Sequence, residues 1–73
     1  MNTTTASKIR ELRRQKGFTQ REMAELIGVS EGAIGMYETG ERIPKDDIKI
    51  KISKLFDKPV GYIFFNEKLA KRE

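Results

Sequence analysis

Candidate residues for catalysis are few in this chain. Its 73 residues include no histidine and no cysteine, which removes the commonest general base, the commonest metal ligand and any disulfide or thiolate metal site. Carboxylates and lysines remain, but they are scattered and no glycine-rich phosphate loop accompanies them. The residue types therefore argue against an enzyme, and we expect neither a metal nor another cofactor.

The net charge of the chain is the second feature that bears on its function. Fifteen Lys and Arg residues against eleven Asp and Glu residues give a formal net charge of +4. This balance fits a nucleic-acid partner, because phosphates attract cations, but many small soluble domains are also mildly basic. The polar first residues and the short apolar runs predict neither a signal peptide nor a membrane span. We therefore expect a cytoplasmic protein without membrane contact.

Short helices must position the charged and polar residues. Apolar spacing together with start and stop residues predicts five helices, over residues 6–16, 20–27, 31–38, 46–56 and 60–65. No segment alternates at period two for long enough to predict a strand. We expect one domain over residues 6–65, a flexible N-terminus over residues 1–5 and a polar C-terminal tail over residues 66–73.

The second and third predicted helices form the most informative pattern. Thr19 followed by Glu22 is a capping box for the second helix. Gly28 is a natural C-terminal stop, and Ser30 is a favoured N-cap for the third helix. Ala24 is small where the two helices should cross. Together these features predict a helix-turn-helix, although a helical hairpin used only for packing would explain any one of them.

Several positions in this region match a known pattern in type and spacing. They are Gln20, Ala24, Gly28-Val29-Ser30, Ile34, Tyr37-Glu38 and Gly40. This run resembles the helix-turn-helix of the lambda repressor/Cro-like family, also called the XRE family. The stretches IRELRRQKGFTQREMAELIGVS and GERIPKDDIKIKISKLFDKPVGYIFF resemble the opening and closing helices of that family, so the resemblance extends over nearly the whole chain.

The resemblance implies a fold and a mode of binding. The fold is all-α, a five-helix lambda-repressor-like domain with the helix-turn-helix at its second and third helices. The function implied is binding of double-stranded DNA, with the third helix in the major groove. Such domains usually act as a homodimer on a palindromic operator.

Contacts to the DNA backbone are also implied residue by residue. The glutamine that opens the second helix contacts a phosphate in this family, and Gln20 takes that place with Thr19 beside it. Ser30, at the start of the third helix, is assigned to the same surface. Arg42 and Lys45 in the following loop are phosphate candidates, but each is equally explained as an ordinary solvated charge.

A scaffold ion pair is implied as well. Arg13 matches a first-helix arginine that pairs with the glutamate ending the third helix, here Glu38. The pair would clamp the third helix to the rest of the domain. A plain structural ion pair is the alternative interpretation.

Base-reading positions fall on Glu31, Gly32, Ala33 and Met36. Members of the family often carry Gln, Arg, Ser or Asn there, and this chain carries none. Glu31 would accept a hydrogen bond from cytosine N4 or merely interact with the helix dipole. Ala33 or Met36 would touch a thymine methyl group, and Met36 would alternatively serve a protein contact. Gly32 suggests that the third helix recognises DNA by fitting closely into the groove, more than by hydrogen bonds from side chains to the bases.

Aromatic residues near the C-terminus raise the question of self-association. Val60, Ile63 and Phe64 are expected to face inward, which leaves Tyr62 and Phe65 for a dimerisation patch. The resemblance points the same way, because the family commonly dimerises near its last helix. A monomer with partly exposed aromatic side chains is the alternative.

Two classes of function remain after this reasoning. The first is a sequence-specific transcriptional regulator, a small Cro-like or immunity-type repressor. The second is a protein-interaction module on the same fold, such as an antitoxin-like or antirepressor protein with a protein partner. Salt dependence separates them, because binding to DNA weakens steeply as salt rises.

Overall fold

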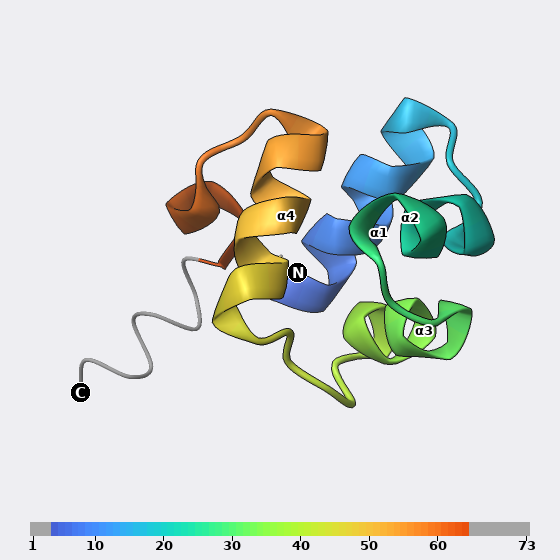
Figure 1. The fold of residues 1–73 in the computed structure, drawn as a ribbon. Helices are drawn as coiled ribbons and strands as arrows, with labels where there is room; N and C mark the ends of the chain where they lie inside the picture. The colour runs from blue at the N-terminus through green and yellow to red at the C-terminus, as the bar shows by residue number, and fades with distance from the viewer. Residues whose placement is uncertain (1–3, 65–73) are drawn as a thin grey trace.

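The computed structural model describes residues 4–64 and contains helices but no strand within them (Figure 1). Four helices are α1 (Thr5–Lys16), α2 (Gln20–Ile27), α3 (Glu31–Thr39) and α4 (Asp46–Phe56). Residues 60–64 are also helical, at the position predicted for a fifth helix. The predicted all-α, five-helix fold is therefore confirmed.

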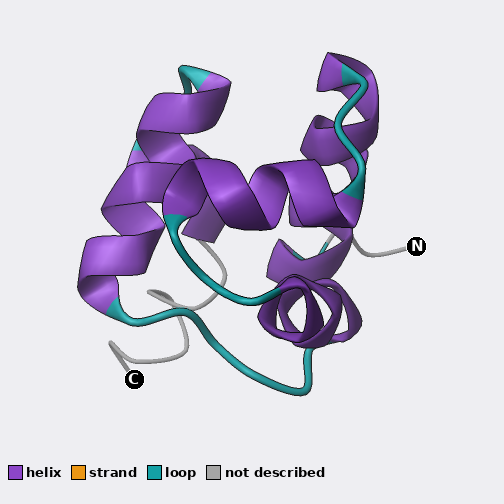
Figure 2. Ribbon diagram, turned by 45° about the vertical axis from the view of Figure 1, so that its right-hand side comes forward, coloured by secondary structure: helices purple, strands orange, loops and turns teal. Residues whose placement is uncertain are grey.

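Helix α2 packs against both α3 and α4, and α1 packs against the same two helices. Figure 2 shows α2 crossing in front between α1 and α4, with α3 viewed nearly along its axis. The loop that joins α3 to α4 projects from the side of the molecule that carries α3 in both views (Figures 1 and 2). This arrangement leaves one long side of α3 uncovered by any other helix.

The core lies where α1, α2 and α3 meet α4 and residues 60–64. Apolar side chains with exposed fractions of 6% or less fill it. They are Ile9, Leu12, Met23, Ala24, Ile27, Ala33, Ile34, Tyr37, Ile52, Phe56, Ile63 and Phe64. All of these except Ala33 lie on helix faces that the sequence marks as inward. Burial of such a face contributes more to the stability of short helices than their intrinsic propensity does.

Local capping sets the ends of α2 and α3 as predicted. The Thr19 hydroxyl accepts a hydrogen bond from the Glu22 backbone N–H at 3.0 Å, and the Glu22 carboxylate accepts from the Thr19 N–H at 2.8 Å. Ser30 Oγ accepts from the Ala33 N–H at 3.1 Å and caps α3. Gly28 and Gly40 end the two helices in the left-handed region, with φ of 77° and 84°, where residues with a side chain are disfavoured.

The N-terminal boundary differs from the sequence-based expectation. Helix α1 begins at Thr5, one residue earlier than expected, because Thr4 and Ser7 form a reciprocal cap at its N-terminus. Thr4 is therefore the N-cap of α1 and Thr5 its first residue, while residues 1–3 lie outside the described part. The predicted tail over residues 66–73 also lies outside it. The flexibility of residues 1–5 stays a prediction.

Within the described residues, no helix is both long enough and apolar enough to span a lipid bilayer.

Candidate nucleic-acid interface

The turn between α2 and α3 is short and fixed by hydrogen bonds. The backbone carbonyl of Ala24 accepts from the N–H groups of both Gly28, at 2.8 Å, and Val29, at 3.0 Å. Val29 is half-buried and packs against the core. Ala24 is buried, with only 3% of its surface exposed, and it belongs to the core to which both helices contribute. The three observations together make a helix-turn-helix.

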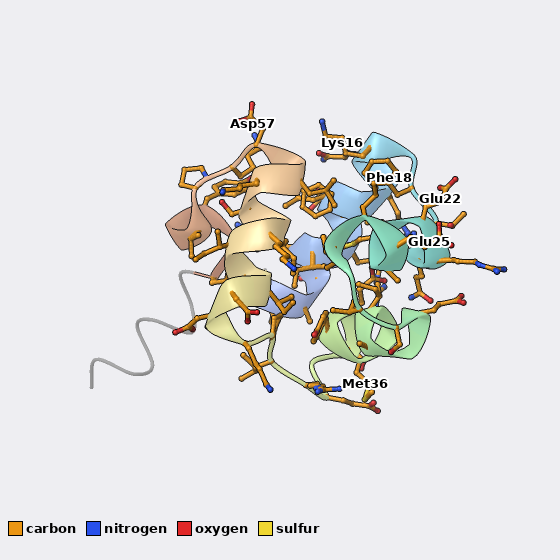
Figure 3. The ribbon with its side chains drawn as sticks, in the orientation of Figure 1. Lys16, Phe18, Glu22, Glu25, Met36 and Asp57 are labelled. Atoms are coloured by element: carbon orange, nitrogen blue, oxygen red, sulfur yellow. The ribbon has the colours of Figure 1, made fainter. Side chains whose placement is uncertain are left out.

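The outward surface of α3 carries Glu31, Gly32 and Met36. Glu31 and Gly32 are exposed, and Met36 is half-buried. Figure 3 shows the Met36 side chain at the outer edge of α3, next to the loop that follows it. Three of the four positions expected to read bases therefore lie on the side of α3 that the other helices leave open.

Ala33 is the exception among these four positions. Only 5% of its surface is exposed, and it belongs to the core. It lies four residues before Tyr37, and residues four apart share a helix face. Its methyl group therefore faces the domain interior, and the structure does not support the expected contact with a base.

The two glycines of α3 do not make room for other parts of the chain within residues 4–64. A Cβ atom built at Gly32 would lie 3.9 Å from Ser30 Oγ, and one built at Gly35 would meet nothing within 4 Å. Each glycine costs the helix about 1 kcal/mol relative to alanine. Internal packing gives no reason for that cost. Because glycine has no side chain, these two positions leave a surface of α3 on which another molecule can approach the helix backbone closely.

A cluster formed by Arg13, Gln20 and Glu38 joins three helices. Arg13 Nε and Nη2 donate to the two carboxylate oxygens of Glu38 at 2.6 and 3.1 Å. Arg13 Nη1 also donates to the Phe18 carbonyl at 2.8 Å. The exposed fractions of the Arg13 and Glu38 side chains are 12% and 3%. The predicted ion pair is thus present and nearly removed from water, and it anchors the C-terminal end of α3 to α1.

Electrostatics in this cluster keep Arg13 charged. The hydrogen bond to Glu38 is the main cause that raises the pKa of Arg13 above its ordinary value, and the charge of Glu38 adds to it. Desolvation acts in the opposite direction but is outweighed. Arg13 therefore stays protonated over the whole pH range in which the protein is ordinarily handled.

Gln20 has a second role that its sequence position does not reveal. Its Nε2 donates to Glu38 Oε1 at 3.2 Å, so one donor of the residue expected to contact phosphate is engaged inside the domain. The side-chain carbonyl and the second Nε2 hydrogen have no partner among the described residues, so they are available for another contact. Gln20 therefore links α2 to α3 as well as lying at the start of α2.

Arg10 is a site residue that sequence reasoning missed. Its Nη2 donates to the Glu38 backbone carbonyl at 3.4 Å, close to the negative end of the α3 dipole, where a cation is favourable. Arg10 lies three residues before Arg13, and residues three apart are neighbours on a helix surface. That spacing is the signal from which its proximity to Glu38 could have been inferred.

The remaining candidates for backbone contacts are exposed. Thr19 and Ser30 cap their helices through their hydroxyl oxygens, and each hydroxyl keeps a proton to donate. Arg42 and Lys45 lie on the loop between α3 and α4, and neither pairs with a carboxylate in the described part of the chain. This loop lies on the same side of the molecule as α3 (Figure 2).

Comparison with known proteins identifies the family. A family model described as Helix-turn-helix matches residues 9–63. The chain belongs to the XRE-type helix-turn-helix family. The fold and the family are those of DNA-binding transcriptional regulators and not of enzymes.

Relatives of this helix-turn-helix domain are named as transcriptional regulators. Over 53 residues it is 38% identical to a protein of Pyrococcus furiosus provisionally named an HTH-type transcriptional regulatory protein, a match that covers 73% of this chain and 17% of that protein. It is 28% identical over 65 residues to the HTH-type transcriptional regulator ImmR of Bacillus subtilis, covering 89% of this chain and 51% of ImmR. The chain thus spans at most about half the length of these two relatives.

A solved structure shares the fold of this helix-turn-helix domain. The P22 c2 repressor in complex with a synthetic operator superposes with a TM-score of 0.83 at 24% sequence identity. The match covers 86% of this chain and 96% of the repressor chain. This similarity confirms the lambda-repressor-like fold.

The expected dimerisation patch of the domain is only partly described. Ile63 and Phe64 are buried, as predicted, and 48% of Tyr62 is exposed. The amines of Lys8 and Lys58 lie 4.3 and 5.4 Å from the centroid of the Tyr62 ring, so the ring carries cation–π contacts within its own chain. Phe65, the other residue expected here, lies outside the described residues.

Metal-binding side chains do not gather in the described part of the domain. Across residues 4–64, no three His, Cys, Asp or Glu side chains lie close enough together to hold an ion.

Proposed function

We propose that this chain is a sequence-specific, double-stranded-DNA-binding transcriptional regulator that acts as a small repressor. In this proposal α3 enters the major groove, and two copies bind a palindromic operator. Repression follows when the bound dimer occupies a promoter. The observation that carries the proposal is the outward face of α3. This face exposes Glu31 and Gly32 beside the half-buried Met36, and the cluster of Arg13, Gln20 and Glu38 holds the helix in place.

Charges around α3 support a DNA backbone as the partner. Arg42 and Lys45 follow α3 on an exposed loop and are not neutralised by a carboxylate in the described residues. Thr19 and the unused polar atoms of Gln20 lie at the start of α2, whose N-terminal dipole favours a phosphate. Such contacts supply affinity that does not depend on sequence and that falls as salt rises.

Sequence discrimination is assigned to Glu31, Gly32 and Met36. The Glu31 carboxylate would accept a hydrogen bond from cytosine N4, and Met36 would contact a thymine methyl group. Gly32 would bring the backbone of α3 close to the base edges. With so few polar readers, part of the discrimination would come from DNA shape at steps that no side chain touches.

Self-association is assigned to the surface around Tyr62. A two-fold dimer would set two α3 helices about 34 Å apart, which is one turn of DNA. The half-exposed ring of Tyr62 supports this assignment. The P22 c2 repressor, which shares this fold, binds a synthetic operator, and that complex is a precedent for the proposed mode of binding.

Selection of bound DNA from a random pool tests the proposal. We expect enrichment of a palindrome whose half-sites are about one helical turn apart, with affinity that falls steeply as salt rises. Failure to enrich any sequence would overturn the proposal. Tight capture of a protein with little salt dependence would favour the alternative, a protein-interaction module that uses the small, mostly uncharged surface of α3.

A further inference from the structure

Ile43 is the most exposed large apolar side chain in the described part of the protein. Its exposed fraction is 61%, compared with 56% for Leu26 and 48% for both Ile50 and Tyr62. It lies on the loop between α3 and α4, with Arg42 before it and Lys45 two residues after it. An isoleucine in this position is held in water between two cations.

The loop is fixed at both ends, so Ile43 cannot easily turn inward. The Met36 carbonyl accepts hydrogen bonds from the backbone N–H groups of Gly40, of Glu41 at 3.0 Å and of Arg42 at 3.3 Å. On the other side of Ile43, Pro44 is buried and its ring fixes the backbone φ angle. The exposure of Ile43 is thus imposed by the loop.

The order of residues in the loop matches the chemistry of a DNA strand. A strand alternates anionic phosphates with deoxyribose rings, whose C–H faces are apolar. The loop presents an apolar side chain between two cations, Arg42 and Lys45. Glu41 is the single carboxylate of residues 41–45, and Asp46 and Asp47 belong to the first turn of α4, whose dipole offsets their charge.

We propose that Ile43 packs against a deoxyribose of the DNA backbone, between the phosphates that Arg42 and Lys45 contact. This inference rests on the proposed function and adds a residue to it. The contact removes apolar surface from water on both partners. It carries no sequence information, because every nucleotide has the same sugar. Ile43 therefore strengthens binding equally on operator and on unrelated DNA.

The Ile43→Ala variant tests this role. We expect its affinity to fall about five- to tenfold on both the selected operator and unrelated duplex DNA, as the loss of one apolar contact predicts. The slope of log affinity against log salt stays at the wild-type value, because no charge is removed. Ile43→Val, which keeps most of the apolar surface, restores most of the affinity.

Leu26→Ala is the matched control, because Leu26 is almost as exposed but lies on α2 outside the proposed DNA surface. It leaves the affinity for DNA unchanged. Unchanged affinity of Ile43→Ala would overturn the inference while the proposed function stands. A loss of DNA affinity in Ile43→Ala would also overturn the inference if sedimentation showed that the variant no longer forms a dimer. Ile43 would then contact a second copy of the chain and not the DNA. If the wild-type protein binds no DNA, the proposed function fails and this inference fails with it.

Discussion

Arg13 of α1 holds Glu38 of α3 in a two-point ion pair, with Nε–Oε2 and Nη2–Oε1 distances of 2.6 and 3.1 Å. The two residues are 25 positions apart in sequence, so the pair joins the first helix to the end of the helix proposed to read DNA. Both side chains are almost fully removed from water. Several properties of the domain depend on this contact.

Removal of one partner of this pair is expected to destabilise the domain strongly. Arg13→Ala leaves the Glu38 carboxylate buried with a single side-chain donor, Gln20, and the free energy of unfolding falls by about 3 kcal/mol. The apolar double variant Arg13→Met with Glu38→Leu loses less, because no buried charge is left unpaired. Denaturant titration of the three proteins measures both effects. A loss below about 1 kcal/mol in Arg13→Ala contradicts the expectation.

The stabilisation by Arg13 is expected to be independent of pH across the neutral and mildly alkaline range. The pKa of Arg13 is raised in the folded state above its ordinary value by the hydrogen bond to Glu38. A raised pKa contributes stability that is complete below the unfolded-state pKa and is lost only as pH rises through the folded-state value. The difference in unfolding free energy between wild type and Arg13→Ala therefore stays constant between about pH 6 and pH 10. A decline within that window would show that another group controls the pair.

Gly32→Ala is expected to separate stability from binding. Among the described residues the added Cβ meets only Ser30 Oγ, at 3.9 Å, so alanine should raise the free energy of unfolding by about 1 kcal/mol through helix propensity. Affinity for the operator should fall, because the methyl group keeps the α3 backbone away from the groove. Thermal melting and fluorescence anisotropy measure the two effects. If stability rises and binding is unchanged, close approach at Gly32 plays no part in recognition.

Arg42→Ala and Lys45→Ala are each expected to weaken binding to all DNA sequences by a similar factor. Each removes one proposed phosphate contact, so the slope of log affinity against log salt should decrease by about 0.9. Lys54, exposed near the C-terminal end of α4, provides a control of the same charge. Lys54→Ala should leave the slope at its wild-type value, and equal effects of all three variants would mean that only net charge matters.

Tyr62→Ala is expected to shift the protein toward monomer, because it removes the half-exposed ring from the proposed dimer surface. Tyr62→Phe keeps the ring and its contacts with Lys8 and Lys58, and it should self-associate like wild type. Sedimentation velocity at several protein concentrations measures the shift. An unchanged distribution in Tyr62→Ala would place the dimer surface elsewhere or show that the protein is a monomer.

Local signals made much of the helix-turn-helix predictable from sequence. The capping pair of Thr19 and Glu22 and the glycine stops at positions 28 and 40 act within a few residues of the helix ends they set. The start of α1 was missed because its cap uses Ser7 in place of the usual glutamate at the third helical position.

Longer-range features of the site were harder to foresee. The hydrogen bonds from Arg10 and Gln20 to Glu38 span 28 and 18 positions, and only the folded packing brings these residues together. The family resemblance places Ala33 among the base-reading positions, and its residue type does not argue against this, because alanine is compatible with either side of a helix. Its burial follows from its four-residue spacing to Tyr37, which is itself buried in the core.

The cluster around Glu38 also has a consequence for the thermodynamics of recognition. Side chains from α1 and α2 hold the end of α3, and the Met36 carbonyl holds the start of the following loop. The conformational entropy of the reading helix is therefore lost when the chain folds and not when it meets a partner. Binding should therefore proceed as the docking of a rigid body. The change in heat capacity on binding should be little larger than the change expected from burial of the interface alone.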